Sequence, residues 1–303
     1  MSEILAKKID WLSYQMRVEA ALEKIVPLSG QAYDPVQEAM RYSLLAGGKR
    51  VRASLVLLMA EAMEENNEAP FLELAVALEM IHAYSLIHDD LPAMDNDDWR
   101  RGRPSCHVAY GEAMAILAGD GLLNSAMEVL FELSRFGKDA VKAASYVAKM
   151  AGVDGMIGGQ TLDLCLTGKK QSEIPEKELL QMIDLKCAAL FRAALLGPAI
   201  LARLEPQLCQ KIEELASVWG RYFQFQDDLL DARASRDSLG KSAGKDQRDH
   251  KLTSLSYYGE ERLREILETE EKRMTQLLDS LTRDGLKLEK VRAYFNYLSQ
   301  RTF

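Results

Sequence analysis

Acidic and basic side chains gather in residues 88–106, which read HDDLPAMDNDDWRRGRPSC. Clustered carboxylates repel one another unless a positive charge lies between them. Mg²⁺ prefers carboxylate oxygens and keeps coordination places for substrate phosphates, and the arginine guanidinium matches the geometry of a phosphate group. The stretch therefore indicates a site for metal and diphosphate. The alternative is a solvated charged loop, because a motif alone is only a hypothesis.

The spacing of the same stretch excludes a calcium-binding loop. Counted from Asp95, the sixth position is Arg100 and the twelfth is Cys106. A loop of that kind needs glycine at the sixth position and glutamate at the twelfth.

A second acidic cluster lies far downstream, in the segment FQFQDDLLD at residues 223–231. Gln224, Asp227, Asp228 and Asp231 follow the i, i+3, i+4, i+7 spacing, which places them on one stripe of a helix. Like charges at this spacing destabilise an isolated helix, so the stripe indicates bound cations. Two such clusters, each with basic residues nearby, predict two helices that hold several metal ions between their carboxylates.

Two glycines and three cations mark a helix junction at residues 47–52, which read GGKRVR. Backbone amides at such a junction, together with Lys49, Arg50 and Arg52, could approach a phosphate. The segment lacks the spacing of a nucleotide-binding P-loop. The alternative is a tight turn with solvated bases.

A central buried helix is predicted over residues 71–88, which are apolar on nearly every side except at Glu73 and Glu79. His82 lies seven residues before Asp89, so both share one face. A lone histidine on such a helix is usually a satisfied core residue, but the shared face favours contact with a ligand here.

The remaining sequence shows helical periodicity almost throughout, which predicts an all-α protein. Helices are expected over residues 3–26, 34–46 (with Asp34 as N-cap), 107–134, 139–168, 175–196 and within 259–303. The helix that begins at Pro175 should end at Gly197–Pro198. Lys186 lies among apolar neighbours in it and needs a partner, or reaches the surface. Residues 232–251 are expected to form one long polar loop, a candidate lid.

Composition limits the function classes. The chain has 303 residues, of which 48% are hydrophobic and 28% are charged, as in an ordinary globular protein. Its net charge of −8 argues against nucleic-acid binding. The four cysteines include no CxxC pair, so reduced thiols and a cytoplasmic location are expected. We also expect no signal peptide and no membrane span.

At this point the ordered motifs resemble those of the trans-isoprenyl diphosphate synthases, in particular bacterial farnesyl diphosphate synthases (geranyltranstransferases). The motifs are GGKRVR at 47–52, EMIHAYSLIHDDLPAMDNDD at 79–98, RRGRPSCH at 100–107, GGQTLDL at 158–164, FQFQDDLLD at 223–231 and LGKSAGKD at 239–246. The Pro92–Ala93 insert is similar to the bacterial form and also to plant-type geranylgeranyl diphosphate synthases.

The resemblance implies a fold and an activity. Residues 1–303 would form a single all-α polyprenyl synthetase domain, a helical bundle around a central cavity, and the protein would be a homodimer. It would be a Mg²⁺-dependent short-chain trans-prenyltransferase with three Mg²⁺ ions, for which Mn²⁺ could substitute. Its substrates would be isopentenyl diphosphate and an allylic diphosphate, dimethylallyl or geranyl. The product would be farnesyl diphosphate, with geranylgeranyl diphosphate as the alternative.

The resemblance also assigns roles to individual residues. Metal binding falls to Asp89, Asp95, Asp227 and Asp231. Catalytic roles fall to Asp89, Asp90, Asp95, Lys186, Asp227 and Asp228. Isopentenyl diphosphate would contact Lys49, Arg52, His82 and Arg101. The allylic diphosphate would contact Arg100, Lys186, Cys187, Gln224 and Lys241. Cys187 departs from the family, which commonly has threonine there, and this puts its contact in question.

Product length is expected to depend on Tyr84 and Ser85. With the diphosphate held at Asp89, the growing chain would run back along the buried helix, and Tyr84 lies roughly 7–8 Å below Asp89 along the axis. Ser85 is too small to block that path, whereas Tyr84 could close it, as the aromatic residue at this place does in farnesyl-forming relatives. The alternative is an ordinary core tyrosine, with the floor formed by Met114 or Leu117.

Three other functions compete with this interpretation. A class I terpene cyclase shares the fold and the metal chemistry but normally lacks an isopentenyl site, so Lys49, Arg52 and Arg101 argue against it. A non-catalytic partner subunit typically loses acids from one motif, and both motifs are complete here. A metal-buffering helical protein would not need the basic residues.

Overall fold

The computed structural model of the protein describes residues 11–237 and 252–300. Nearly all regular structure in them is helical, and the strands β1 (Trp99–Arg100) and β2 (Arg103–Pro104) have two residues each. The predicted all-α class is therefore confirmed. Contacts between Cα atoms divide the chain into two compact units. Of the described residues, 11–148 and 197–203 form what we call the amino unit, and 149–196, 204–237 and 252–300 form the carboxy unit.

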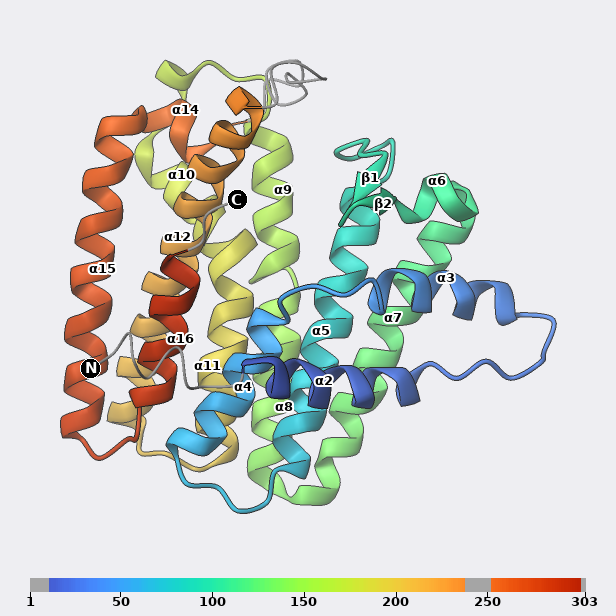
Figure 1. Ribbon diagram of the computed structural model, residues 1–303, viewed down its shortest axis with the longest axis horizontal. Coiled ribbons are helices and arrows are strands. Elements are labelled where there is room, and N and C mark those ends of the chain that lie inside the picture. Colours follow the sequence, from blue (N-terminus) through green and yellow to red (C-terminus); the bar gives the residue numbers. More distant parts are fainter. Residues whose placement is uncertain (1–10, 238–251, 301–303) are drawn as a thin grey trace. The chain divides into compact units, whose positions relative to one another are not determined.

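The amino unit is organised around α5 (Ala69–Asp89), the predicted central helix. Its neighbours in space are α2 (Trp11–Ile25), α3 (Asp34–Leu44), α4 (Val51–Ala62) and α7 (Glu112–Glu132), as Figure 1 shows. Around them lie α6 (Cys106–Tyr110), η1 (Leu133–Phe136) and most of α8 (Lys138–Ala151). Apolar side chains on nearly all sides explain the burial of α5, whereas the partly buried His82 and Asp89 share the one stripe that is less covered.

Glycines on α7 allow the close packing of the amino unit. A Cβ atom on Gly119 would lie 2.1 Å from Nε2 of His88, and one on Gly121 would lie 2.8 Å from Sδ of Met40. Larger residues at these two positions would push α5 and α3 away from α7.

Two helices in the described part of the chain are long and apolar enough to cross a membrane, by length and composition alone. The first is α5. Of its most apolar stretch of 18 residues, 72% are buried, as expected for a core helix of a folded unit. The second covers Glu112–Phe136. Of its most apolar stretch of 18 residues, only 33% are buried. This second helix therefore leaves an apolar surface uncovered in the amino unit.

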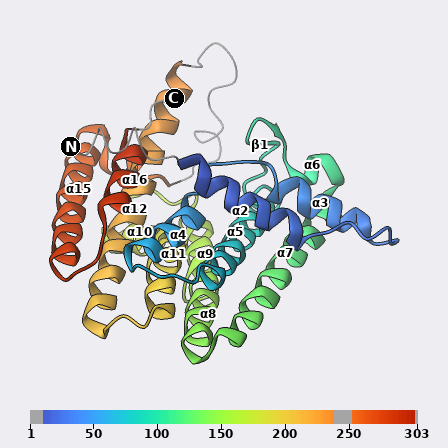
Figure 2. The same ribbon diagram turned by 60° about the horizontal axis from the view of Figure 1, so that its bottom comes forward.

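The carboxy unit is built on α12 (Pro206–Asp237), which lies beside α15 (Glu260–Arg283), as Figure 2 shows. Its other helices are α9 (Met156–Leu166), η2 (Gln171–Glu173), α10 (Glu176–Ile183), the π-helical turn η3 (Asp184–Ala188), α11 (Ala189–Leu201, up to Leu196), α14 (Ser254–Tyr258) and α16 (Glu289–Ser299). One apolar cluster joins α9, α10, α12 and α15 and includes Phe225 and Leu229. These two residues anchor the helix that carries the second acidic cluster.

Several predicted boundaries are wrong. The expected helix 107–134 breaks at Gly111, which has a φ of 85°, and 139–168 divides into α8 and α9. Asp34 accepts hydrogen bonds from Ser29 and Gly30, so it caps the preceding turn and not its own helix. The helix α12 continues to Asp237, and the remainder of the expected loop 232–251 lies outside the described residues.

The helix end predicted at Gly197–Pro198 is also wrong. Pro198 lies inside α11, which continues to Leu201. Proline removes one backbone hydrogen bond, but Gly197 packs so closely that a Cβ atom there would lie 3.2 Å from Leu74 and 3.3 Å from Val147. Apolar packing outweighs the missing bond at this position.

Candidate active site

The first acidic cluster folds back onto the end of α5. Asp89 is the last residue of the helix, and its carbonyl accepts the backbone N–H of Asp95 at 2.8 Å. The Asp90 carbonyl likewise accepts the N–H of Asp97 at 3.1 Å. These bonds bring Asp89 and Asp95 together although Pro92 and Ala93 separate them in sequence, and both aspartates are half-buried.

Asp90 forms an ion pair with Arg100. Its carboxylate is 3% exposed and accepts hydrogen bonds from Nε of Arg100 at 3.0 and 3.2 Å, and another from Nη2. Burial raises the pKa of Asp90, and the adjacent guanidinium of Arg100 opposes that rise. Arg100 is thus bound to protein carboxylates, Asp90 and Asp97, in this structure. Its predicted contact with an allylic diphosphate stays a prediction.

The hairpin β1–β2 positions the next arginine. Arg101 and Gly102 have φ values of 53° and 75° and connect Arg100 to Arg103, which are paired across the two strands. Two positive φ values are typical of the tight turns that fit the twist of a hairpin. An Arg-Gly pair between arginines was a weak signal for such a turn, and sequence reasoning missed it.

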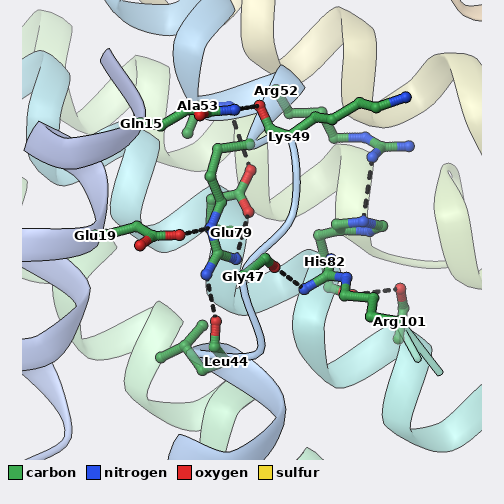
Figure 3. A network of polar contacts seen from close by, with 12 residues as sticks. Gln15, Glu19, Leu44, Gly47, Lys49, Arg52, Ala53, Glu79, His82 and Arg101 are labelled. Carbon is green, nitrogen blue, oxygen red and sulfur yellow. Dashed lines mark hydrogen bonds and ion pairs between the residues drawn. The ribbon is translucent and has the colours of Figure 1, made fainter. Parts of the chain in front are cut away.

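Arg101, in the turn of this hairpin, is part of what we call the basic cluster, which consists of Lys49, Arg52, His82 and Arg101 (Figure 3). Nη1 of Arg52 lies 3.3 Å from Nε2 of His82, and Arg101 donates to the carbonyl of Gly47. A Cβ atom on Gly48 would lie 3.0 Å from the guanidinium carbon of Arg101. The absence of a side chain at Gly48 therefore allows Arg101 to approach the backbone there. The structure therefore brings Arg52 to His82 and Arg101 to the glycine loop, as an anion-binding site requires.

The charge state of His82 follows from this environment. Burial, and then the positive charges of Arg52, Arg101, Arg50 and Arg100, hold the pKa of His82 well below its usual value. A neutral imidazole can accept a hydrogen bond from Arg52. The basic cluster thus presents guanidinium groups beside an uncharged ring.

Arg50 differs from what the junction motif indicated. Its side chain is 1% exposed and forms an ion pair with Glu79, with 3.2 Å between Nη1 and Oε2. It therefore points into the amino unit and not toward a phosphate. The signal for this pair was Glu79 itself, an acidic residue in an otherwise apolar helix.

The second acidic cluster forms one stripe of α12, as its spacing predicts. Asp227 and Asp228 are half-buried and Asp231 is exposed. Asp228 is tied to the protein: Oδ2 accepts the backbone N–H of Ser254 at 2.6 Å and its hydroxyl, and Oδ1 accepts Nε2 of Gln224 at 2.7 Å. Burial raises its pKa, and these hydrogen bonds oppose the rise. Ser254 was missed because nothing in the sequence connects it to the cluster.

A π-helical turn carries Lys186 and Cys187 beside this stripe. Lys186 forms an ion pair with the buried Asp163 of α9, so the lysine has the partner that its surroundings demand. The thiol of Cys187 donates to Oε1 of Gln224 at 2.7 Å. π-Helical turns occur frequently at functional sites, and periodicity alone could not reveal this one.

Two glycines, one in α9 and one in α12, pack closely against the π-helical turn. A Cβ atom on Gly159 would lie 2.0 Å from the backbone nitrogen of Lys186, and one on Gly220 would lie 2.3 Å from the Cα of Ala188. Any side chain at either position would displace the turn.

The donor set of both clusters fits Mg²⁺. Half-buried Asp89, Asp95 and Asp227 and exposed Asp231 offer carboxylate oxygens, and Mg²⁺ needs only one or two of them together with substrate phosphates. Within residues 11–237 and 252–300, no three His, Cys, Asp or Glu side chains converge on one point. A substrate diphosphate could supply further oxygen ligands to Mg²⁺ at either cluster. Lys241, predicted to contact the allylic diphosphate, lies outside the described residues.

Comparisons with known proteins identify the family of this chain. The sequence model of the polyprenyl synthetase family matches residues 34–298. The chain belongs to the polyprenyl synthetase family. As a member of it, the protein is a prenyltransferase of isoprenoid biosynthesis, of the short-chain trans type, and acts on isoprenyl diphosphates.

Individual relatives of this polyprenyl synthetase differ in the product that they are named for. Geranylgeranyl pyrophosphate synthase 11 of Arabidopsis thaliana is 43% identical over 86% of this chain and 74% of its own. A geranyltransferase structure from Legionella pneumophila has 32% identity and a TM-score of 0.84, and covers 100% of this chain and 99% of its own. An FPP/GFPP synthase from Zymomonas mobilis has 29% identity and a TM-score of 0.83, and covers 98% of this chain and 99% of its own.

Proposed function

We propose that the protein condenses isopentenyl diphosphate head-to-tail with dimethylallyl or geranyl diphosphate and that farnesyl diphosphate is its final product. The observation that carries the condensation is the arrangement on α5. His82, part of the basic cluster, and Asp89 of the first acidic cluster share one face of this helix, about 10 Å apart along its axis. One helix face thus supports two sites of different chemistry, a cationic one and a carboxylate one, as two diphosphate substrates would need.

The allylic diphosphate would be held at the carboxylate site. The family resemblance assigns Mg²⁺ to Asp89 and Asp95 of the first acidic cluster and to Asp227 and Asp231 of the second, and Mg²⁺ bound there would neutralise negative charge on a diphosphate. Lys186 would donate to its oxygens, and charge that develops on the departing group would be stabilised by such fixed cations. We propose that the basic cluster holds isopentenyl diphosphate.

Bond formation would then proceed by ionisation, condensation and proton loss. The C–O bond of the allylic diphosphate breaks, and the double bond of isopentenyl diphosphate attacks the resulting allylic cation. The released diphosphate takes the proton that the product loses. Exclusion of water during these steps protects the cation from hydrolysis.

The farnesyl product is proposed from Tyr84. Its side chain is buried at 5% exposure, and its ring lies edge-on to His88 with 5.8 Å between the centroids. Burial, and then the charge of Asp89, raises the pKa of Tyr84 to about 12. A bulky, rigid ring one and a half turns below Asp89 would stop a growing chain. Leu117, the alternative floor, is 54% exposed in the amino unit.

Geranylgeranyl diphosphate is the second candidate product. Two relatives with 43% and 42% identity are named for it, and this favours a product of twenty carbons over one of fifteen. The structural neighbours include enzymes named for farnesyl diphosphate or geranyl transfer. Identity over a whole chain reports the shared fold and reaction, whereas chain length depends on a few residues below the first acidic cluster.

We also propose a homodimer formed through α7. Ile116, Leu117 and Phe131 are 45%, 54% and 75% exposed, and Val141 of α8 is 48% exposed. These large exposed apolar side chains support an interaction site on α7 and α8, because folded units rarely leave large apolar surface uncovered. Sedimentation velocity should give twice the mass of 34.0 kDa for the wild type and a smaller mass for Phe131→Lys.

One incubation tests the activity. Purified protein receives isopentenyl diphosphate with either dimethylallyl or geranyl diphosphate, in Mg²⁺ and in excess EDTA, and the dephosphorylated products are separated by chromatography. We expect a C15 alcohol in Mg²⁺ only. A C20 alcohol would select the second candidate. Product formation in EDTA, or none under any condition, would contradict the proposed reaction.

A further inference from the structure

The interior of the amino unit holds an ion pair directly behind the basic cluster. The side chains of Arg50 and Glu79 are 1% and 2% exposed, with 3.2 Å between Nη1 and Oε2. Arg50 also donates to the carbonyl of Leu44 at 2.6 Å and to the carboxylate of Glu19 at 3.3 Å. All three nitrogens of the guanidinium thus have acceptors.

Glu79 also caps α4. Its second oxygen, Oε1, accepts the backbone N–H of Ala53 at 3.4 Å. Amides of the first helical turn have no partner within their own helix, and a negative charge is favourable at this end. One carboxylate of α5 therefore fixes both the residue that precedes α4 and its first turn.

The backbone at Arg50 is left-handed. It has φ 46° and ψ 40° and immediately precedes Val51, the first residue of α4. This conformation costs a residue other than glycine roughly 1–2 kcal/mol, and burial of an ion pair carries a desolvation penalty as well. Stability alone is therefore a poor reason for the arrangement, since apolar residues would fill the same space at lower cost.

The geometry gives a different reason. The turn at Arg50 sends its side chain inward, whereas Lys49 is exposed and Arg52 meets His82. Figure 3 shows Lys49 and Arg52 extending on the side of His82, with Glu79 between them and Glu19. Gln15 donates to the carbonyl of Lys49 at 2.9 Å and holds the loop from its other end.

We propose that the Arg50–Glu79 pair is a positioning device that fixes the start of α4, so that Lys49 and Arg52 meet one diphosphate together with Arg101. This inference rests on the proposed binding of isopentenyl diphosphate at the basic cluster. The carboxylate of Glu79 also offsets repulsion in the cluster: the charge of Arg50 lowers the pKa of Arg101 after the larger effect of burial, and Glu79 opposes that lowering.

The first test is Glu79→Gln, which keeps the shape of the side chain and an oxygen for the amide of Ala53 but removes the charge. We expect the KM for isopentenyl diphosphate to rise roughly tenfold, with kcat and the allylic KM within about twofold of the wild type, because only one substrate site is disturbed. Calorimetric titration with isopentenyl diphosphate alone should show the same loss in Kd. Arg50→Lys keeps the charge and should recover part of the affinity that Arg50→Met loses.

The second test separates positioning from stability. In Arg50→Met/Glu79→Met both charges are gone, and apolar replacement of a buried ion pair is often neutral for stability. We expect a melting temperature near that of the wild type but a KM for isopentenyl diphosphate as high as in Glu79→Gln. Arg273→Met/Glu214→Met removes an exposed pair of the carboxy unit and is the matched control.

The outcomes are distinct. Normal KM and Kd for isopentenyl diphosphate in Glu79→Gln, or in the double variant, would overturn the inference whatever the melting temperature. If the double variant does not fold, Glu79→Gln and Arg50→Lys still decide by calorimetry. Failure of the proposed function would appear instead in the wild type, as absent turnover and absent binding of isopentenyl diphosphate.

Discussion

Ser254 donates both its backbone N–H, at 2.6 Å, and its hydroxyl to one carboxylate oxygen of Asp228. At the other acidic cluster, the carboxylate of Asp90 accepts hydrogen bonds from the guanidinium of Arg100. In each Asp-Asp pair, the second aspartate is therefore engaged by the protein that surrounds it. We expect metal to bind at the first aspartate of each pair, Asp89 or Asp227, because metal at the second aspartate would have to displace these hydrogen bonds.

Removal of a metal-binding carboxylate should lower activity without loss of stability. We expect Asp89→Ala and Asp227→Ala each to lower kcat/KM roughly 10²–10³-fold. This corresponds to a loss of about 3–4 kcal/mol of transition-state stabilisation. Steady-state kinetics in saturating Mg²⁺ measures this, and Asp98→Ala, at an exposed aspartate of the same loop, is the control. Near-normal turnover in either variant would refute the two-cluster metal site.

Removal of Asp228 should instead lower stability. Ser254 and Gln224 would lose their acceptor inside the protein, and unsatisfied buried donors cost about 1–3 kcal/mol. We expect the free energy of unfolding in urea to fall by that amount in Asp228→Ala, compared with Asp154→Ala at an exposed position. An unchanged unfolding midpoint would show that the contact with Ser254 contributes nothing.

Lys186 should have two separable roles. Lys186→Met leaves the carboxylate of Asp163, 5% exposed, without its ammonium partner, and an uncompensated buried charge costs about 3–5 kcal/mol. Lys186→Met/Asp163→Asn should recover most of that stability and none of the activity. Lys142→Met is the control, because Lys142 is 64% exposed in its ion pair with Asp139. It should change neither stability nor activity. Recovery of activity in the double variant would exclude a diphosphate contact by Lys186.

His82 should make stability depend on pH. The pKa of His82 is held well below the usual value in the folded protein. Below about pH 6.5, the His82 side chain is therefore protonated in the unfolded chain but remains neutral in the folded protein. The free energy of unfolding should therefore fall as pH decreases from 7 to 5, by at most about 1.4 kcal/mol per pH unit from this group. Urea titrations of wild type and His82→Gln should show a shallower dependence in the variant, and equal slopes would contradict a neutral buried His82.

Tyr84 should set product length. Tyr84→Ala removes the ring below Asp89, and we expect the main product to shift from fifteen to twenty carbons. Tyr84→Phe keeps the ring and should keep the C15 product, because the Tyr84 hydroxyl is buried without a hydrogen-bond partner. Chromatography of dephosphorylated products decides the question. A C20 product from the wild type, or C15 from Tyr84→Ala, would place the floor elsewhere.

Features that depend only on local pattern could be predicted from the order of the residues. Continuous apolarity predicted the buried helix α5, and the i, i+3, i+4, i+7 spacing predicted the carboxylate stripe of α12. Both follow from the 3.6-residue repeat of the helix, which needs no knowledge of distant neighbours. Predictions failed where packing outweighs local preference, as at Pro198 inside α11.

The partner of each charged residue follows from the folded chain and not from local pattern. Arg50 with Glu79, Lys186 with Asp163, and Asp228 with Ser254 are each separated by more than twenty residues of sequence. No local pattern distinguishes Asp89 from Asp90 or Arg50 from Arg52, because each pair has the same charge and adjacent or nearby positions. Burial and partners separate the two members of each pair. Desolvation forces the buried charges of Asp90 and Arg50 to find a counter-charge within the fold, whereas Asp89 is half-buried and Arg52 meets His82.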